Sequence, residues 1–446
     1  MLGVKALIAV GLGTMLGGIF TTVGAGAHAS GPAVIAAFGL SGLTCLFVAL
    51  CYAELASMVP VAGSAYTYAY AALGEVVAWV IGWDLILEYG ISVAPLAATF
   101  SGALQQLLGR VGIALPTWAQ TANVVVKHGG LDLAHTQVDV LAFLTILALS
   151  VVLSIGIRES SATNVILVVV QLVALVAFTL GVAGAVHPQL YHPFAPSGLG
   201  GIVAGAAAVF FAYIGFDTVT VASEEAVNPK RDVPRAIIGS LIIGGVLFTV
   251  VAAVAVGVVA WDKIDTNSGL LDAVIHAGNN PLLFAIVLIG TVTGTSASML
   301  ISLLGQIRIF YVMSRDRLLP PAFGAVNART RTPLLMTMTT GTVVAILALG
   351  VPLTTLLEFV NIGTLSAFVI VCAGVMALRF THPDVERPFR VPFGPIVVPA
   401  IGIVLCVWLT VGGLGPPTWA RFGIWFLVGL LIYALYGYRH SLLRTR

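Results

Sequence analysis

The sequence has 446 residues, of which 59% are hydrophobic and 9% are charged, and its formal net charge is +2. Soluble domains carry roughly 25% charged residues, so this composition excludes a soluble globule and requires a surface that faces lipid. The small net charge gives no reason to expect a nucleic-acid partner, and the four cysteines and eight histidines show no metal-ligand spacing.

Apolar runs that could cross a bilayer occur twelve times along the chain, because a helix needs about 20 such residues to span about 30 Å of hydrocarbon. We expect helices near residues 4–25, 33–58, 74–108, 137–157, 162–186, 199–222, 235–260, 281–312, 333–350, 354–378, 394–413 and 419–438. No signal-peptide cleavage site follows the first run, which should therefore be retained. The sequence predicts an all-α integral membrane protein of twelve transmembrane helices, with residues 1–446 forming one polytopic domain.

The segments between these runs differ in charge. We expect external loops at 109–136 and at 261–280, the second with a short helix near 270–276. Cytoplasmic segments are expected at 223–234, 313–332 and 379–393. With the N-terminus in the cytoplasm, sixteen of the twenty Lys and Arg residues fall on or near that side: Lys5, Arg158, Lys230, Arg231, Arg235, Arg308, Arg315, Arg317, Arg329, Arg331, Arg379, Arg387, Arg390, Arg439, Arg444 and Arg446. The positive-inside rule then predicts a multi-pass protein of the cell membrane with both termini cytoplasmic.

Glycine interrupts two of the runs. The first carries four glycines between residues 11 and 18, each costing a helix about 1 kcal/mol relative to alanine, and the sixth contains Gly215 beside Asp217. If both helices unwind in mid-membrane, bare amides could bind a substrate carboxylate and freed carbonyls its ammonium group. The alternative is that the glycines only allow close helix packing.

The position of these two runs favours unwinding. They are corresponding members of two five-span halves, about 4–186 and 199–378, which two further helices follow at about 394–438. We therefore predict that helices 1 and 6, at corresponding positions of the two halves, are discontinuous.

Ionisable residues inside the runs also indicate functional positions, since a charged residue at the centre of a helix costs about 2.5–3.5 kcal/mol in membrane insertion. Glu88 and Asp217 are candidates for an ion relay or a gate, or for a structural hydrogen bond between helices. Asp84 lies nearer the entry of the third span, and Glu54 is expected near the cytoplasmic end, where a structural role is equally plausible. The polar run Thr291–Ser298 in the eighth span could line a cation site or bond to its own backbone.

Four long segments resemble a known family: Cys51–Glu75, Ile81–Gly90, Phe210–Leu241 and Gly305–Pro320. They look like the amino acid–polyamine–organocation superfamily, and within it like bacterial members of the cationic amino acid transporter family. The resemblance covers nearly the whole chain. It implies two inverted five-helix repeats plus two helices, with alternating access around a site in mid-membrane.

The resemblance also implies roles for individual residues. The amides of Gly17 and Gly18, followed by Ile19, would bind the substrate carboxylate, and the carbonyls of Met15 and Leu16 would help to hold the amine. In the sixth span the carbonyls of Phe211, Ala212 and Ile214 would complete the amine site, and Phe211 matches an aromatic gate over the substrate. Met299 would restrict side-chain size, and Glu88 and Asp217 match acidic positions of the family.

Three features depart from the family pattern. The first-span motif Gly17–Phe20 is one residue short, which would shift the carboxylate site. Gln171, which follows the Gly156–Ser160 motif, stands where the family has a proton-handling lysine, and an amide cannot titrate. The chain also starts inside the first-span motif, so we leave open whether Met1 is the natural start.

These observations together predict a secondary active permease for L-amino acids rather than an enzyme, because no intramembrane histidine could serve as a base or metal ligand. An exchanger or facilitator without ion coupling, and a non-transporting amino acid sensor, remain as alternatives. No cofactor is expected. The coupling ion, H⁺ or Na⁺, would be handled by Glu88, Asp217, Gln171 or Ser296, and Met299 favours small neutral substrates over cationic ones.

Overall fold

The computed structural model describes residues 2–58, 66, 69–70, 74–123, 126–127, 130–131, 136–155, 161–220, 223–327 and 332–441. The motif at 156–160 lies outside the described residues. The α-helices are α1 (Val4–Ser30), α2 (Val34–Met58), α4 (Glu75–Leu85), α5 (Val93–Arg110), α6 (Val140–Ile155), α7 (Ser161–Val182), α8 (Gly198–Val209), α9 (Pro229–Val258), α10 (Gly269–His276), α11 (Pro281–Arg315), α12 (Leu334–Gly350), α13 (Leu353–Thr381), α14 (Val397–Gly413), α15 (Pro416–Ile432) and α16 (Tyr438–His440).

Helix occupies each of the twelve ranges expected from the sequence, in the part of the chain that the structure describes. Eight helical segments there are long and apolar enough to cross a membrane: Val4–Met58, Glu75–Arg110, Thr163–Ala185, Gly198–Thr220, Pro229–Val258, Pro281–Arg315, Leu353–Thr381 and Pro416–His440. The first of them contains both α1 and α2, joined by a 3-10 turn at Gly31–Ala33. Three shorter helices, α6, α12 and α14, are also apolar.

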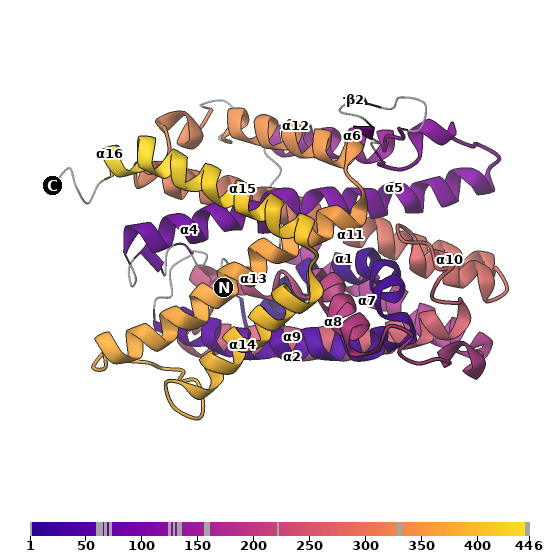
Figure 1. Ribbon diagram of the computed structural model, residues 1–446, viewed down its shortest axis with the longest axis horizontal. Helices are drawn as coiled ribbons and strands as arrows, with labels where there is room; N and C mark the ends of the chain where they lie inside the picture. The colour runs from indigo at the N-terminus through magenta and orange to yellow at the C-terminus, as the bar shows by residue number, and fades with distance from the viewer. Residues whose placement is uncertain are drawn as a thin grey trace.

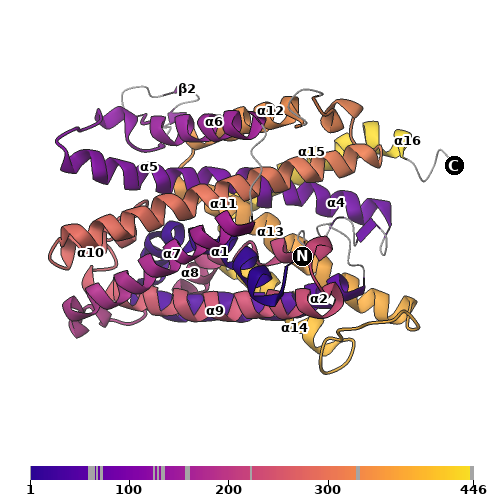
Figure 2. The same ribbon diagram turned by 180° about the vertical axis from the view of Figure 1, so that it is seen from behind.

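The helices form a layered bundle. Helices α2 and α9 lie side by side along one edge, and α6 and α12 lie side by side along the opposite edge (Figure 1, Figure 2). Helices α1 and α8 lie between these edges and pack against each other, and α11 contacts both α1 and α5. This arrangement brings α1, α5, α8 and α11 together in the interior.

The sixth span is broken, as the sequence predicted. Helix α8 ends at Val209, and two 3-10 turns follow, η6 (Phe210–Tyr213) and η7 (Phe216–Thr220). Between them Ile214 is extended with ψ 133° and Gly215 has φ +113°, a region that favours glycine.

Side chains from other helices bind the backbone carbonyls that the break leaves exposed. Ser41 of α2 donates to the carbonyl of Ala206 at 2.6 Å, and Asn361 of α13 donates to that of Ala207 at 2.7 Å. The last carbonyls of a helix have no intrahelical partner, so these two side chains stabilise the end of α8 inside the protein.

The first span is not broken, and the prediction of a discontinuous helix 1 is wrong. Helix α1 is continuous from Val4 to Ser30. Its glycines serve close packing instead: a Cβ on Gly18 would lie 2.5 Å from the Cα of Ala212, and one on Gly17 would lie 2.9 Å from the carbonyl oxygen of Gly294. Packing of this kind outweighs the weak helix propensity of glycine.

The third span contains a feature that the sequence did not predict. Between α4 and α5 the backbone forms a π-helical turn, η2 (Ile86–Ile91). Such turns are rare and occur frequently at functional sites. Because η2 contains Glu88 and Tyr89, it determines the direction in which both side chains point.

The loops hold two further elements. Helix α10 confirms the short helix expected near 270–276. The segment 109–136 contains a small antiparallel hairpin of β1 (Val126–Lys127) and β2 (Gly130–Leu131), which was not expected.

Glu54 at the end of α2 holds the segment between α13 and α14. Arg379 of α13 donates to the Glu54 carboxylate from Nε at 2.8 Å, and the backbone N–H of Val391 donates to it at 2.7 Å. Arg387 lies 3.4 Å from the same carboxylate, and its guanidinium also donates to four backbone carbonyls. A buried carboxylate is stable only with such partners, which supports the structural interpretation of Glu54.

Candidate functional site

A small cavity of about 20 Å³ lies where α1, the break after α8, the η2–α5 segment and α11 meet. Its lining residues come from all four elements: Thr14, Gly18, Glu88, Tyr89, Ser92, Leu96, Phe211, Ile214, Gly215, Thr218, Ser298 and Ser302. A water molecule needs roughly 10–15 Å³ of such volume. The cavity is therefore too small for an amino acid, so a ligand of that size requires the surrounding groups to move apart.

The wall formed by α1 is built from hydroxyl contacts and one close backbone approach. Thr14 and Thr218 share a hydrogen bond of 2.8 Å between their hydroxyl groups. Ser298 of α11 donates to the carbonyl of Thr14 at 2.9 Å. Gly18 and Gly215 allow α1 to touch the broken segment, since a Cβ on Gly215 would lie 2.6 Å from that of Thr14.

Of two buried acidic side chains in this region, Glu88 lines the cavity and Asp217 lies next to the lining residue Thr218 in the sequence, and their surroundings differ. Tyr89 donates a hydrogen bond of 2.6 Å to Asp217, which is 1% exposed. Glu88 is also 1% exposed, and neither of its carboxylate oxygens has a hydrogen-bond partner among the described residues. An unpaired buried charge is costly, so Glu88 is the group here that most needs a proton, a cation or a ligand donor.

A third buried acidic residue, Asp84, lies one helical turn before Glu88. Ser366 of α13 donates to one of its oxygens at 2.8 Å, and the other oxygen has no partner in the described part of the chain. Asp84 does not line the cavity.

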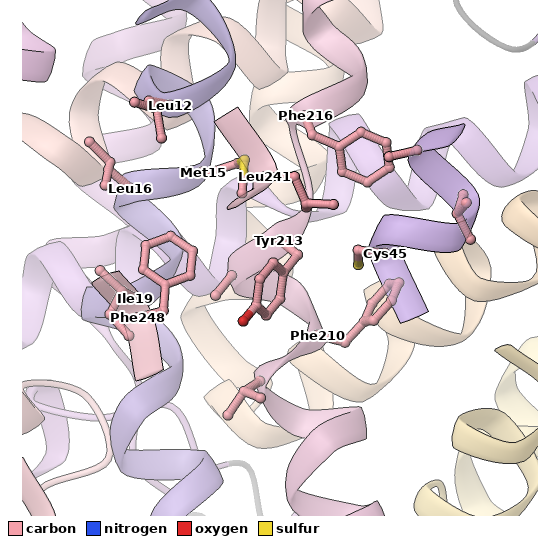
Figure 3. Close-up of a cluster of buried hydrophobic side chains, with 14 of the residues drawn as sticks. Leu12, Met15, Leu16, Ile19, Cys45, Phe210, Tyr213, Phe216, Leu241 and Phe248 are labelled. Atoms are coloured by element: carbon pink, nitrogen blue, oxygen red, sulfur yellow. The ribbon is translucent and has the colours of Figure 1, made fainter. Parts of the chain in front are cut away.

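Phe211 lies at the cavity together with Ile214 and is 4% exposed, so its ring is in a position to cover a ligand. Ala212 contacts Gly18 through its backbone. Three further predicted residues, Met15, Leu16 and Ile19, belong to a buried apolar cluster with Leu241 and Phe248 of α9 (Figure 3). Met299 is fully buried in a second apolar cluster and does not line the cavity.

Gln171 and Ser296 were the other candidates for ion coupling. Gln171 is fully buried on α7, and neither its amide oxygen nor its nitrogen has a hydrogen-bond partner among the described residues. It faces α11, because a Cβ on Gly294 would lie 3.4 Å from its amide carbon. Ser296 is half-buried on α11 and lies outside the cavity lining.

Several cavity residues were missed from the sequence. Ser92 and Leu96 follow Glu88 at intervals of four residues, and Ser302 follows Ser298 at the same interval. Residues four apart share one face of a helix, so these two spacings could have identified the polar faces that meet at the cavity. Tyr89 points to the cavity because of the π-helical turn, which no spacing in the sequence indicates.

The profile of the family described as amino acid permease matches residues 2–435. The branched-chain amino acid permease BcaP of Bacillus subtilis (strain 168) is 40% identical over 441 residues, which cover 99% of this chain and 93% of the relative. The methylthioribose transporter of the same organism is 38% identical over 439 residues, covering 98% and 93%. The vacuolar cationic amino acid transporter 4 of Arabidopsis thaliana is 38% identical over 389 residues, covering 85% and 63%.

Apolar helices packed around a buried, hydroxyl-lined cavity are typical of a multi-pass membrane transporter. The chain belongs to the amino acid permease family of the amino acid–polyamine–organocation superfamily. The resemblance noted from the four sequence segments is thereby confirmed, and the relatives named above are all transporters.

Proposed function

We propose that this protein is a secondary active transporter that carries neutral L-amino acids across the cell membrane by alternating access. The observation that supports this most directly is the small cavity at the break of the sixth span, lined by Glu88, whose carboxylate has no partner among the described residues. In this proposal the present conformation is an occluded state. Access to the cavity opens when the helices around it tilt apart.

We propose that side-chain hydroxyls and free carbonyls hold the substrate. Because α1 remains helical, the amides of Gly17 and Gly18 stay within the helix, and the hydroxyls of Ser298 and Ser302 take over recognition of the carboxylate. Carbonyls at the break, with those of Phe211 and Ile214 nearest the cavity, receive the ammonium group. The apolar side chains of Leu96, Phe211 and Ile214 favour an aliphatic substrate side chain.

Glu88 is our candidate for the coupling residue. Its carboxylate is buried at the cavity without a partner, so binding a proton or the substrate ammonium group removes the cost of an isolated charge. Asp217 is held by Tyr89 and would share the proton with Glu88 when the cavity opens. Gln171 cannot take part, because an amide does not titrate.

We further propose the topology expected from the sequence. Helices α1 and α2 cross the membrane separately, the three shorter apolar helices also cross, and both termini are cytoplasmic. Short helices can cross a bilayer that thins locally around them, which makes the lengths of α6, α12 and α14 compatible with crossing.

Uptake by the purified protein in proteoliposomes tests this function. Radiolabelled alanine, leucine, lysine and arginine should be supplied with an imposed proton gradient, with a sodium gradient and with neither. We expect proton-driven accumulation of alanine and leucine. Counterflow without accumulation would identify an exchanger, and ligand binding without any flux would identify a sensor; either result would overturn ion-coupled transport.

A second candidate substrate is a neutral hydroxylated molecule such as methylthioribose, the substrate named for one relative. The continuous α1 supports this candidate, because a helix without free amides lacks the usual binding groups for a carboxylate. Competition by unlabelled methylthioribose in the alanine assay distinguishes the two substrates. Strong competition together with weak alanine uptake would favour the sugar.

A further inference from the structure

Two adjoining apolar cavities lie on the side of the bundle where α11, α12 and α15 meet. Their volumes are about 230 Å³ and about 350 Å³, and both are lined by Ile86, Phe310, Phe323 and Trp425. We refer to the two cavities together as the lateral groove. It extends from Leu347 of α12 at one end to Tyr436 beyond α15 at the other.

The lining of the lateral groove suits hydrocarbon. It contains no charged side chain among the described residues, and its polar groups are two threonines of α12, the tyrosine hydroxyl and the indole nitrogens of two tryptophans. The helices beside it expose apolar side chains: Val343 is 54% exposed and Leu427 of α15 is 66% exposed. In a membrane protein such a surface lies against lipid, so an acyl chain can enter the groove from the side.

Two exposed arginines flank one end of the groove in the sequence. Its lining there includes Leu319 and Tyr436. The two chain segments meet at this point, since a Cβ on Gly437 would lie 3.4 Å from the carbonyl oxygen of Leu318. The exposed residues Arg317 and Arg439 lie close to these lining residues in the sequence, Arg317 two positions before Leu319 and Arg439 three positions after Tyr436. Two arginines at the end of an apolar channel complement the phosphate of a lipid and its acyl chain.

We propose that the lateral groove binds one anionic phospholipid of the leaflet that surrounds the Arg317 end, which is cytoplasmic in the proposed topology. One acyl chain lies along Phe310, Phe323 and Trp425. The phosphate lies at Arg317 and Arg439. This site is separate from the central cavity, and its occupancy does not depend on which solute the protein carries.

The π-helical turn η2 connects the lipid site with the central cavity. Its residues Ile86, Gly90 and Ile91 line the lateral groove, whereas Glu88 and Tyr89 line the central cavity. An acyl chain against Ile86 and Gly90 therefore supports the turn that holds Glu88 in place. This second step rests on the proposed transport function: a bound anionic lipid should increase the transport rate.

Native mass spectrometry of the purified protein tests the binding step. The protein is extracted in mild detergent and titrated with phosphatidylglycerol or with phosphatidylcholine. We expect a resolved adduct of one phosphatidylglycerol, which Val343→Trp abolishes by filling the groove. The matched control is Val404→Trp on α14, a valine that is 64% exposed and lies outside the groove. Equal loss or equal retention of the adduct in both variants would overturn the site.

The charge of the headgroup is tested with Arg317→Gln and Arg439→Gln. Each arginine should contribute about fivefold to the preference for phosphatidylglycerol over phosphatidylcholine. Arg390→Gln, an exposed arginine on the segment between α13 and α14, is the control and should leave the preference unchanged. An unchanged preference in both groove variants would overturn the phosphate contact. Because these readouts measure lipid and not solute, they remain decisive even if the proposed transport function fails.

Discussion

Tyr89 on the π-helical turn donates a 2.6 Å hydrogen bond to Asp217 on the broken sixth span. The two residues belong to segments 128 positions apart, and both side chains are buried. This bond joins the two irregular backbone segments of the interior directly. Any movement that opens the central cavity between them must stretch or break it.

The Tyr89–Asp217 bond should stabilise the closed conformation. In Tyr89→Phe the Asp217 carboxylate loses a buried donor, which costs about 1–3 kcal/mol. We expect a lower melting temperature in detergent and a shift toward open conformations, measured as faster labelling of a cysteine introduced at Ser92. Tyr213→Phe, which removes a bond to the carbonyl of Phe38 in the apolar core, is the control and should lower stability without changing the labelling rate.

Glu88→Gln should separate substrate binding from ion coupling. The amide keeps the shape of the side chain but cannot exchange a proton at physiological pH. We expect proton-driven accumulation to be lost while counterflow of alanine persists. Asp84→Asn is the control, since Asp84 lies outside the cavity lining. Full accumulation by Glu88→Gln would show that coupling occurs elsewhere.

Phe211→Ala should weaken closure over the substrate. Removing the ring opens the side of the cavity that it covers, so we expect the half-saturation concentration to rise about tenfold, the equivalent of ~1.4 kcal/mol. Preloaded substrate should also leak faster. Phe210→Ala, which alters the apolar core instead, provides a comparison. Unchanged uptake and leak in Phe211→Ala would remove Phe211 from the gate.

Gln171→Lys should introduce pH dependence into transport. The buried amide has no partner among the described residues, so a titratable amine at the same place can gain or lose a proton during the cycle. Uptake measured from pH 5 to 9 should change more steeply with pH than in the parent protein. Gln171→Met, of similar size and without charge, should leave the profile as it was. A flat profile in the lysine variant would reject the match of this position with the proton-handling lysine of the family.

Gly18→Ala should destabilise the protein because its Cβ would lie 2.5 Å from a backbone atom, the Cα of Ala212. Overpacking of this kind typically costs 1–3 kcal/mol. Gly39→Ala in α2 is the matched control: it has open space around the new methyl group and should be neutral or stabilising by about 1 kcal/mol. Thermal unfolding of both variants in the same detergent measures the difference.

The helical ranges could be predicted from the sequence because lipid allows so few alternatives. Runs of apolar residues must form helices where no water can satisfy the backbone, and each of the predicted ranges contains one within the described residues. The break near Gly215 was also predictable, since a glycine and a carboxylate together disfavour a regular helix in mid-membrane.

The continuous α1 could not be predicted in the same way. Its glycines suggested unwinding, but glycine propensity is a weak local term, and the contacts of Gly17 with α11 and Gly18 with Ala212 depend on the packed bundle. The same limit applies to Met15, Leu16 and Met299, whose burial in apolar clusters follows from the rotation of each helix. Glu88 was recognised from the free-energy cost of a charge inside a span and from its match to an acidic position of the family, whereas its lack of a partner among the described residues could be seen only in the structure.

The hydrogen bonds and ion pairs of Glu54 bear on how the helices can move. The carboxylate is bound by Arg379, by Arg387 and by the backbone of Val391. The end of α2 is therefore firmly connected to the segment that leads from α13 into α14. In the proposed alternating-access motion, a movement of the bundle edge that contains α2 and α9 would carry α14 with it. The moving unit in this proposal would then extend beyond the two expected five-span halves and include α14, one of the two helices that follow them.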